Sequence, residues 1–240
     1  MLTLYFSGTG NTRHVAIRFS ERMPAECHSI EETCDFDALI QAQETVCFCY
    51  PIYGSCVPRI LREFVLSHRS ALAGKNLVLF CTQLLFSGDG ARVFTDLLKD
   101  IPHRVMYAEH IRMPNNLCNV FVLPVRNGDQ CRRTITKADH AVDRAVAHIR
   151  AGRIVKRGFH PLSRALGFFL QRAFFPQIEA SAGHSVRVNR DCTSCGLCVR
   201  QCPMDNLHLE PAAEGPGILR QDGNCTLCYR CVNLCPQKAI

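Results

Sequence analysis

The chain has 240 residues, of which 47% are hydrophobic and 20% charged, and its formal net charge is +7. This composition excludes collagen-like, coiled-coil and wholly disordered chains. Sixteen cysteines are too many to explain by packing. The start of the chain lacks a basic leader, and no apolar run approaches 18 residues. We therefore expect a reducing cytoplasm, where thiols bind metals more often than they form disulfides.

Residues 1–150 alternate short apolar runs with amphipathic segments, which is the pattern of β-α-β units around a parallel sheet. The fold class predicted is α/β, with a doubly wound sheet of five strands. In chain order, strands are expected at 1–6, 26–30, 45–50, 76–82 and 105–112, and helices at 12–22, 36–42, 58–68, 90–100 and 130–150.

A glycine loop follows the first predicted strand and leads into a helix. It consists of Ser7, Gly8, Thr9, Gly10, Asn11 and Thr12. At this junction, backbone amides and small hydroxyls can converge on a phosphate beside the positive helix end. Neither a Walker A ending nor the third glycine of a dinucleotide fingerprint is present, because Arg13 stands where that glycine would be.

The loop from Ser7 to Thr12 resembles the FMN phosphate loop of flavodoxins, and the strand pattern agrees with that fold. The resemblance implies two further loops that hold the flavin ring at the carboxyl ends of the strands. The first comprises Pro51, Ile52, Tyr53, Gly54 and Ser55, and the second includes Thr82, Gln83, Phe86, Ser87 and Gly88. The chain lacks the tryptophan of many flavodoxins, so Phe86 replaces it or one ring face stays open.

Residues 152–183 are predicted to form a linker with one short amphipathic helix. This segment could contact a membrane surface or simply pack against both neighbouring domains. Eleven Lys/Arg against three acids lie between Arg126 and Arg172, so the positive charge of the chain is concentrated there. Such a region could attract an acidic redox partner or anionic lipid, or be a solvated face. Nucleic-acid binding is not expected, because no nucleic-acid motif accompanies these charges.

A cysteine pattern occurs twice in residues 184–240, as C-x2-C-x2-C-x3-C-P with a period of 33 residues. This spacing is the bacterial ligand run for [4Fe-4S] clusters, and the region resembles two-cluster ferredoxins. The resemblance implies crossed ligation, in which the fourth cysteine of each run binds the other cluster. One cluster would take Cys192, Cys195, Cys198 and Cys235, and the other Cys225, Cys228, Cys231 and Cys202. A pair of zinc sites is the alternative, although zinc ribbons usually present separated C-x2-C pairs.

Together the segments resemble the flavodoxin-ferredoxin fusion proteins of anaerobic microbes. The implied division is 1–151 for an FMN domain, 152–183 for the linker and 184–240 for the two-cluster domain. We expect an electron carrier that passes electrons between FMN, two [4Fe-4S] clusters and a partner redox protein, without catalytic side chains. The alternative is an oxidoreductase whose flavin reduces a small organic substrate, such as a quinone, with electrons entering through the clusters.

Overall fold

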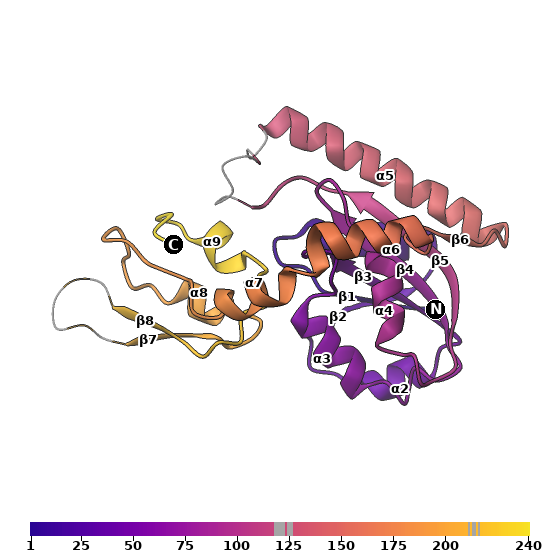
Figure 1. The fold of residues 1–240 in the computed structure, drawn as a ribbon, viewed down its shortest axis with the longest axis horizontal. Helices are drawn as coiled ribbons and strands as arrows, with labels where there is room; N and C mark the ends of the chain where they lie inside the picture. The colour runs from indigo at the N-terminus through magenta and orange to yellow at the C-terminus, as the bar shows by residue number, and fades with distance from the viewer. Residues whose placement is uncertain (118–122, 124–126, 211, 213–214, 216) are drawn as a thin grey trace.

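A six-stranded parallel sheet forms the N-terminal half of the computed structural model, which describes residues 1–117, 123, 127–210, 212, 215 and 217–240. The strand order is β2-β1-β3-β4-β5-β6, so the chain winds outward from β1 in both directions. The strands are β1 (Leu2–Tyr5), β2 (Glu26–Ser29), β3 (Thr45–Pro51), β4 (Asn76–Gln83), β5 (Arg104–Arg112) and β6 (Val155–Lys156). This arrangement confirms the predicted doubly wound fold (Figure 1).

Helices cover both faces of the sheet because its strands are buried on both sides. On one face, α1 and α5 pack against Cys47, Cys49, Val78 and Phe80. On the other, α2, α3 and α4 pack against the alternate side chains of the same strands, such as Phe48. The helices are α1 (Asn11–Arg22), α2 (Phe36–Gln41), α3 (Arg59–Ser67), α4 (Gly90–Asp96) and α5 (Gly128–Arg150).

The sixth strand lies beyond residue 151, where the sequence predicted the domain to end. β6 pairs with β5 in parallel, with Val155 opposite Tyr107 and Lys156 opposite Ala108. A strand of two residues has no periodicity that a sequence pattern could reveal. The sheet therefore reaches four to five residues into the predicted linker.

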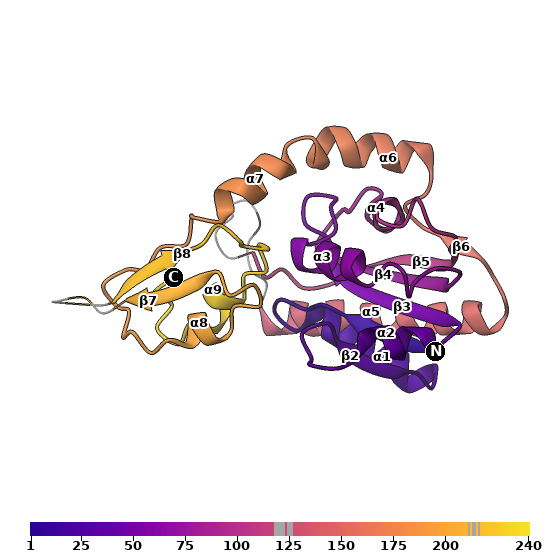
Figure 2. The same ribbon diagram turned by 90° about the horizontal axis from the view of Figure 1, so that it is seen from below.

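Three consecutive helical pieces follow β6, where one short helix was predicted. They are α6 (Pro161–Gly167), the π-helical turn η1 (Phe168–Arg172) and α7 (Phe175–Ala182). We call residues 161–182 the strap. It runs along the outside of the molecule past α4 and α3 and leads to the C-terminal unit (Figure 2). Because α5 packs on the opposite face of the sheet, the basic residues from 132 to 172 are divided between two faces.

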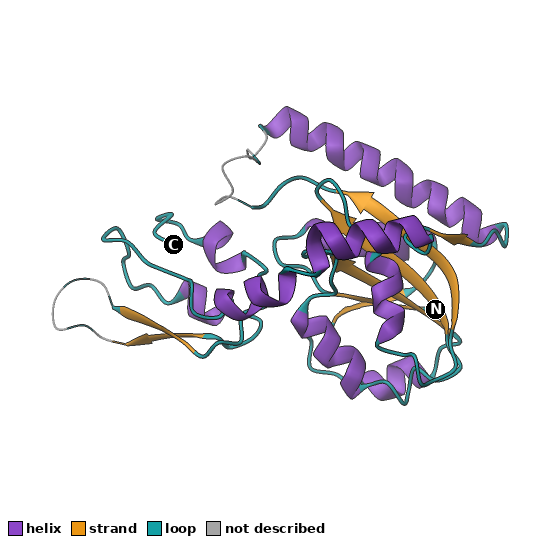
Figure 3. Ribbon diagram, in the orientation of Figure 1, coloured by secondary structure: helices purple, strands orange, loops and turns teal. Residues whose placement is uncertain are grey.

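The C-terminal unit contains a small antiparallel hairpin of β7 (Leu207–Glu210) and β8 (Ile218–Gln221), with α8 (Leu197–Arg200) and α9 (Arg230–Leu234). It faces the carboxyl ends of the parallel strands, toward which the arrowheads point in Figure 3. Within the described residues, no helix has the length and apolar character needed to cross a membrane.

Candidate functional site

The predicted phosphate loop joins β1 to α1 and is closed by its own polar groups. The Gly10 amide donates to Ser7 Oγ at 3.1 Å, and Gly10 adopts a φ of 99° that favours glycine. The buried hydroxyls of Thr12 and Thr82 lie 2.8 Å apart. This contact joins the predicted phosphate loop to the predicted ring-binding loop that begins at Thr82, at one edge of the sheet.

A cavity of about 490 Å³, counted to its open mouth, lies between these loops. The structure brings ten of the predicted flavin residues into its lining, namely Ser7, Gly8, Thr9, Asn11, Thr12, Pro51, Ile52, Tyr53, Thr82 and Gln83. Gln83 Oε1 is buried and has no hydrogen-bond partner among the described residues. A buried acceptor of this kind requires a donor, and an N–H group of a bound flavin ring would supply one. The lining therefore fits FMN.

Residues after β5 complete the cavity, and sequence reasoning missed them. They are Met113, Pro114, Asn116 and Leu117, together with Leu84 after β4. Asn116 Nδ2 donates to Thr9 Oγ1 at 2.7 Å, so it positions a hydroxyl of the predicted phosphate loop. These residues could have been predicted from their position directly after a strand, because parallel sheets of this kind bind ligands at the carboxyl ends of their strands.

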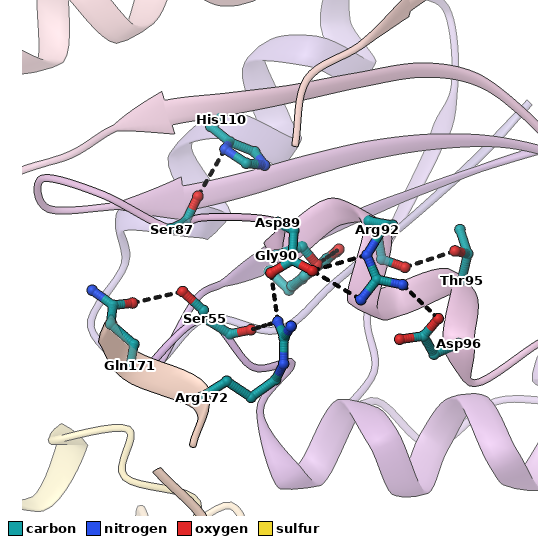
Figure 4. Close-up of polar contacts among 11 residues, drawn as sticks. Ser55, Ser87, Asp89, Gly90, Arg92, Thr95, Asp96, His110, Gln171 and Arg172 are labelled. Atoms are coloured by element: carbon teal, nitrogen blue, oxygen red, sulfur yellow. Dashed lines mark hydrogen bonds and ion pairs between the residues drawn. The ribbon is translucent and has the colours of Figure 1, made fainter. Parts of the chain in front are cut away.

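The remaining predicted flavin residues lie outside this lining. Gly54, Ser55 and Gly88 contact the strap: Ser55 Oγ donates to Gln171 Oε1 at 2.7 Å, and a Cβ on Gly88 would lie 2.4 Å from Gly167 Cα. A Cβ on Gly54 would likewise overlap the Phe175 ring. Ser87 pairs with His110 Nδ1 at 2.7 Å (Figure 4). Phe86 is 41% exposed, and Gly10 shapes the loop backbone without lining the cavity.

A buried carboxylate anchors the strap beside these loops. Asp89 is fully buried and forms ion pairs with Arg92, at 2.8 Å, and with Arg172 of the strap (Figure 4). Arg172 Nη1 also donates to the Ser55 carbonyl oxygen at 3.4 Å. The strap is thus fastened to the ends of the loops after β3 and β4.

The eight repeat cysteines lie in two separate groups. One cavity, of about 420 Å³ with its mouth included, is lined by Cys192, Cys195, Cys198 and Cys235. In the other set, burial raises the pKa of Cys228 to about 11, and the charges of Cys225 and Cys202 add to this rise. Burial similarly raises the pKa of Cys231 to about 12, with Cys228, Cys225 and Cys202 adding to it. A thiol with a raised pKa becomes a ligand when a bound metal cation displaces its proton.

The two cysteine runs have the same backbone shape. Left-handed φ values occur at Ser194 and Leu227, at Gly196 and Tyr229, and at Asp205 and Lys238, each pair 33 residues apart. Amide hydrogen bonds to sulfur also recur, from Asn206 to Cys202 at 3.4 Å and from Ala239 to Cys235 at 3.3 Å. In the described part of the chain, no group of three or more His, Cys, Asp or Glu side chains has a geometry that could hold a metal ion.

The Cys225 to Cys231 run lies directly against the predicted phosphate loop. A Cβ added to Gly8 would lie 2.4 Å from the Cys228 carbonyl oxygen. Arg230 donates to the carbonyl oxygens of Ser7 and Gly8 at 2.9 and 3.1 Å, and it forms an ion pair with Glu31 at 2.7 Å. The two halves of the molecule therefore meet at the two candidate cofactor sites.

Family comparisons agree with this geometry. Residues 2–122 match the family model of a flavodoxin domain, and residues 191–239 match that of a 4Fe-4S dicluster domain. The chain belongs to the flavodoxin domain family. Because the second match follows in the same chain, its domain composition is that of a flavodoxin-ferredoxin fusion. Comparison with curated proteins finds no match.

Several solved structures are similar to the N-terminal part. A two-electron reduced flavodoxin from Megasphaera elsdenii is 19% identical, with 58% of this chain and 99% of that chain covered and a TM-score of 0.42. Oxidised Flavodoxin 2 from Bacillus cereus is 17% identical, with coverages of 62% and 97% and a TM-score of 0.42. A WrbA-like flavodoxin from Agrobacterium tumefaciens is 15% identical, with coverages of 63% and 98% and a TM-score of 0.43.

The matched domains define the cofactors and the general role. The flavodoxin domain implies FMN, and the dicluster domain implies two [4Fe-4S] clusters. Flavins exchange one or two electrons, whereas iron-sulfur clusters exchange one at a time. The role of the protein is flavin and iron-sulfur electron transfer.

Proposed function

We propose that this protein carries electrons between its flavin site and a partner redox protein, with the two clusters arranged in series. The cluster held by Cys225, Cys228, Cys231 and Cys202 is the nearer one to the flavin loop. The cluster held by Cys192, Cys195, Cys198 and Cys235 is the outer one, where electrons enter or leave. We further propose that the ten predicted flavin residues that line the cavity are ligand contacts, whereas Gly54, Ser55 and Gly88 hold the strap.

The observation that carries this proposal is the contact of Cys228 and Arg230 with Ser7 and Gly8. The Cys228 carbonyl oxygen would lie 2.4 Å from a Cβ on Gly8, so backbone packs on backbone with no intervening side chain. Arg230 binds the carbonyl oxygens of the same loop. Because the guanidinium is shared between the loop and Glu31, it fixes the nearer cysteine run in one orientation.

The charge of the protein favours an acidic partner. The formal net charge of the polypeptide is +7, and the exposed cations of α5 include Arg133 and Lys137. A positively charged surface accelerates the encounter with a negatively charged protein, and salt screens this effect. The rate of electron delivery to such a partner should therefore fall as ionic strength rises.

A pair of cysteine variants tests the order of the centres. In the anaerobically purified protein, the flavin is photoreduced and the bleaching of the iron-sulfur absorbance is followed. Cys195→Ser removes a ligand of the outer set, so rapid bleaching of the nearer cluster should persist. Cys228→Ser removes a ligand of the nearer set, so transfer should slow by at least about tenfold.

Three outcomes would contradict the proposal. Equal rates of cluster bleaching in the two variants would contradict the proposed serial order of the clusters. If photoreduction of the flavin never bleaches the cluster absorbance of the unaltered protein, electrons do not pass from the flavin to the clusters and the proposal is wrong. Steady turnover of a quinone, with electrons supplied through the clusters and no protein acceptor required, would favour the reductase instead.

A further inference from the structure

The outward side of the strap carries an uncovered row of large apolar side chains. We call it the outer stripe, and it consists of Leu162, Leu166, Leu170, Phe174 and Ile178, which are 61, 39, 63, 61 and 52% exposed. Phe169 lies beside it and is 69% exposed. Single exposed apolar residues are ordinary on protein surfaces, but a contiguous row of this length marks an interaction surface.

The π-helical turn reduces the rotation of this row around the helix axis between α6 and α7, which lie at an angle to each other (Figure 2). A spacing of four residues drifts by about 40° per step around an ordinary α-helix, so a long row would wind away from its face. The Ala173 amide donates to the Phe168 carbonyl oxygen at 2.9 Å, which is the i to i+5 bond of a wider turn. This wider turn offsets the drift, so Gly167, Gln171 and Phe175 remain on the inward side at the same spacing.

The inward side of the strap is already occupied by contacts with the sheet domain. Gln171 binds Ser55 and Arg172 binds Asp89 (Figure 4). Gly167 packs directly on Gly88. The strap therefore cannot rotate to bury its outer stripe without breaking a buried ion pair. The exposed side chains of the stripe therefore remain uncovered in this arrangement of the strap.

The charges near the outer stripe are positive. No Asp or Glu occurs from residue 151 to residue 178. Arg153, Lys156 and Arg164 are exposed, and none of them forms an ion pair with another described residue. Arg157, also exposed, pairs with Glu109 at 2.6 Å. The one acid of the strap, Glu179, forms an ion pair with Arg62 at 2.6 Å. An apolar face accompanied mainly by cations is typical of helices that lie in the surface of an anionic bilayer.

We propose that the strap is a membrane-contact surface through which the protein binds anionic lipid bilayers, with the outer stripe in the headgroup region and the cations against the lipid phosphates. A second copy of this chain is a poorer occupant, because a twofold interface would bring the same cations together. This inference does not depend on the order of the redox centres. It places the flavin loops after β3 and β4 close to the bilayer, since the strap is fastened to them.

Vesicle flotation of the full-length protein, with its cofactors bound, tests the proposal. We expect binding to vesicles of phosphatidylglycerol and phosphatidylcholine, and binding at least about tenfold weaker to phosphatidylcholine alone or in high salt. The variant F169S/F174S should bind the mixed vesicles more than about tenfold more weakly. The matched control L66S/I218S changes residues that are 49 and 48% exposed elsewhere, and it should bind like the unaltered protein.

A charge-reversed variant gives a second measurement that leaves the apolar residues intact. Each cation near an anionic surface changes partitioning by about fivefold, so K156E/R164E should reduce binding at least about 25-fold. Flavin and cluster absorbance verify that each variant is folded. The proposal is overturned if the unaltered protein does not float with anionic vesicles or if F169S/F174S floats equally well. It is also overturned if sedimentation shows a dimer that F169S/F174S converts to a monomer.

Discussion

Asp89 is the residue on which the attachment of the strap depends. Its carboxylate is fully buried between Arg92 and Arg172, whose side chains are 18 and 17% exposed. Removing one member of a buried ionic group leaves uncompensated charge, at a cost of about 3 kcal/mol or more. We expect Asp89→Asn to lower the free energy of unfolding of the sheet domain by that amount in urea titrations.

A matched substitution separates this effect from ordinary surface electrostatics. Asp96 binds the same Arg92 at 2.8 Å, but its side chain is 55% exposed. Exposed ion pairs contribute little, so Asp96→Asn should change the free energy of unfolding by less than about 1 kcal/mol. Equal effects of the two substitutions would contradict the structural role given to Asp89.

His110 makes the stability of the sheet domain depend on pH. Burial, together with the positive charge of Arg157, lowers the pKa of His110 from 6.5 to about 4. Between these pH values the unfolded state binds a proton that the folded state does not, so the folded state loses stability as pH falls. The loss should reach up to about 3 kcal/mol from pH 6.5 to 4.

Substitution of His110 by asparagine should abolish this part of the pH dependence. The amide group can still meet Ser87, whose Oγ lies 2.7 Å from His110 Nδ1, and it does not titrate. Urea unfolding of both proteins across that pH range gives the comparison. His140→Asn, at an exposed position on α5, serves as the control and should keep the full pH dependence.

At the scale of elements, the position of the strap depends on a close contact between Gly167 and the backbone at Gly88 and Asp89. A Cβ on Gly167 would lie 2.4 Å from Asp89 Oδ1 and 3.3 Å from Gly88 Cα. Gly167→Ala should therefore push α6 away, destabilise the domain by about 1–3 kcal/mol and increase hydrogen exchange of the strap. Gly128→Ala on α5 meets only the Arg132 side chain, at 3.4 Å, and should change neither quantity appreciably. Unchanged strap exchange in the Gly167 variant would refute this explanation.

At the scale of the whole molecule, the crossed ligation that we propose would join two sequence repeats into one unit. Cys235 lines the cavity of Cys192, Cys195 and Cys198, although it is a neighbour of Cys231 in the sequence. The double variant C195S/C235S should therefore lose one cluster and retain about four irons per chain. The double variant C228S/C235S should lose both clusters, because its substitutions fall in different sets. Iron analysis after anaerobic purification distinguishes these outcomes, and uncrossed ligation would reverse them.

The redox centres and the fold class were predictable from the sequence because their signals are local. Three cysteines at two-residue spacing bring their thiols together through short-range backbone turns, whatever the rest of the chain does. The loop from Ser7 to Thr12 joins a buried strand to a helix, and this junction alone indicates a phosphate site. The buried strands were recognisable as continuous apolar runs.

The partners of these local features were decided by tertiary structure. Nothing near Ser55 or Gly88 in the sequence indicates that they contact a strap some 80 or more residues away. Likewise, nothing near Asn116 indicates that its side chain donates a hydrogen bond to Thr9. The position of Cys228 against Gly8 joins residues 220 positions apart. The sequence by itself determined which cofactors the chain can bind, because ligand spacing is a short-range property. Only the tertiary structure decided which cysteine run lies against the phosphate loop and which side of the strap remains exposed to solvent, because both depend on packing between distant segments.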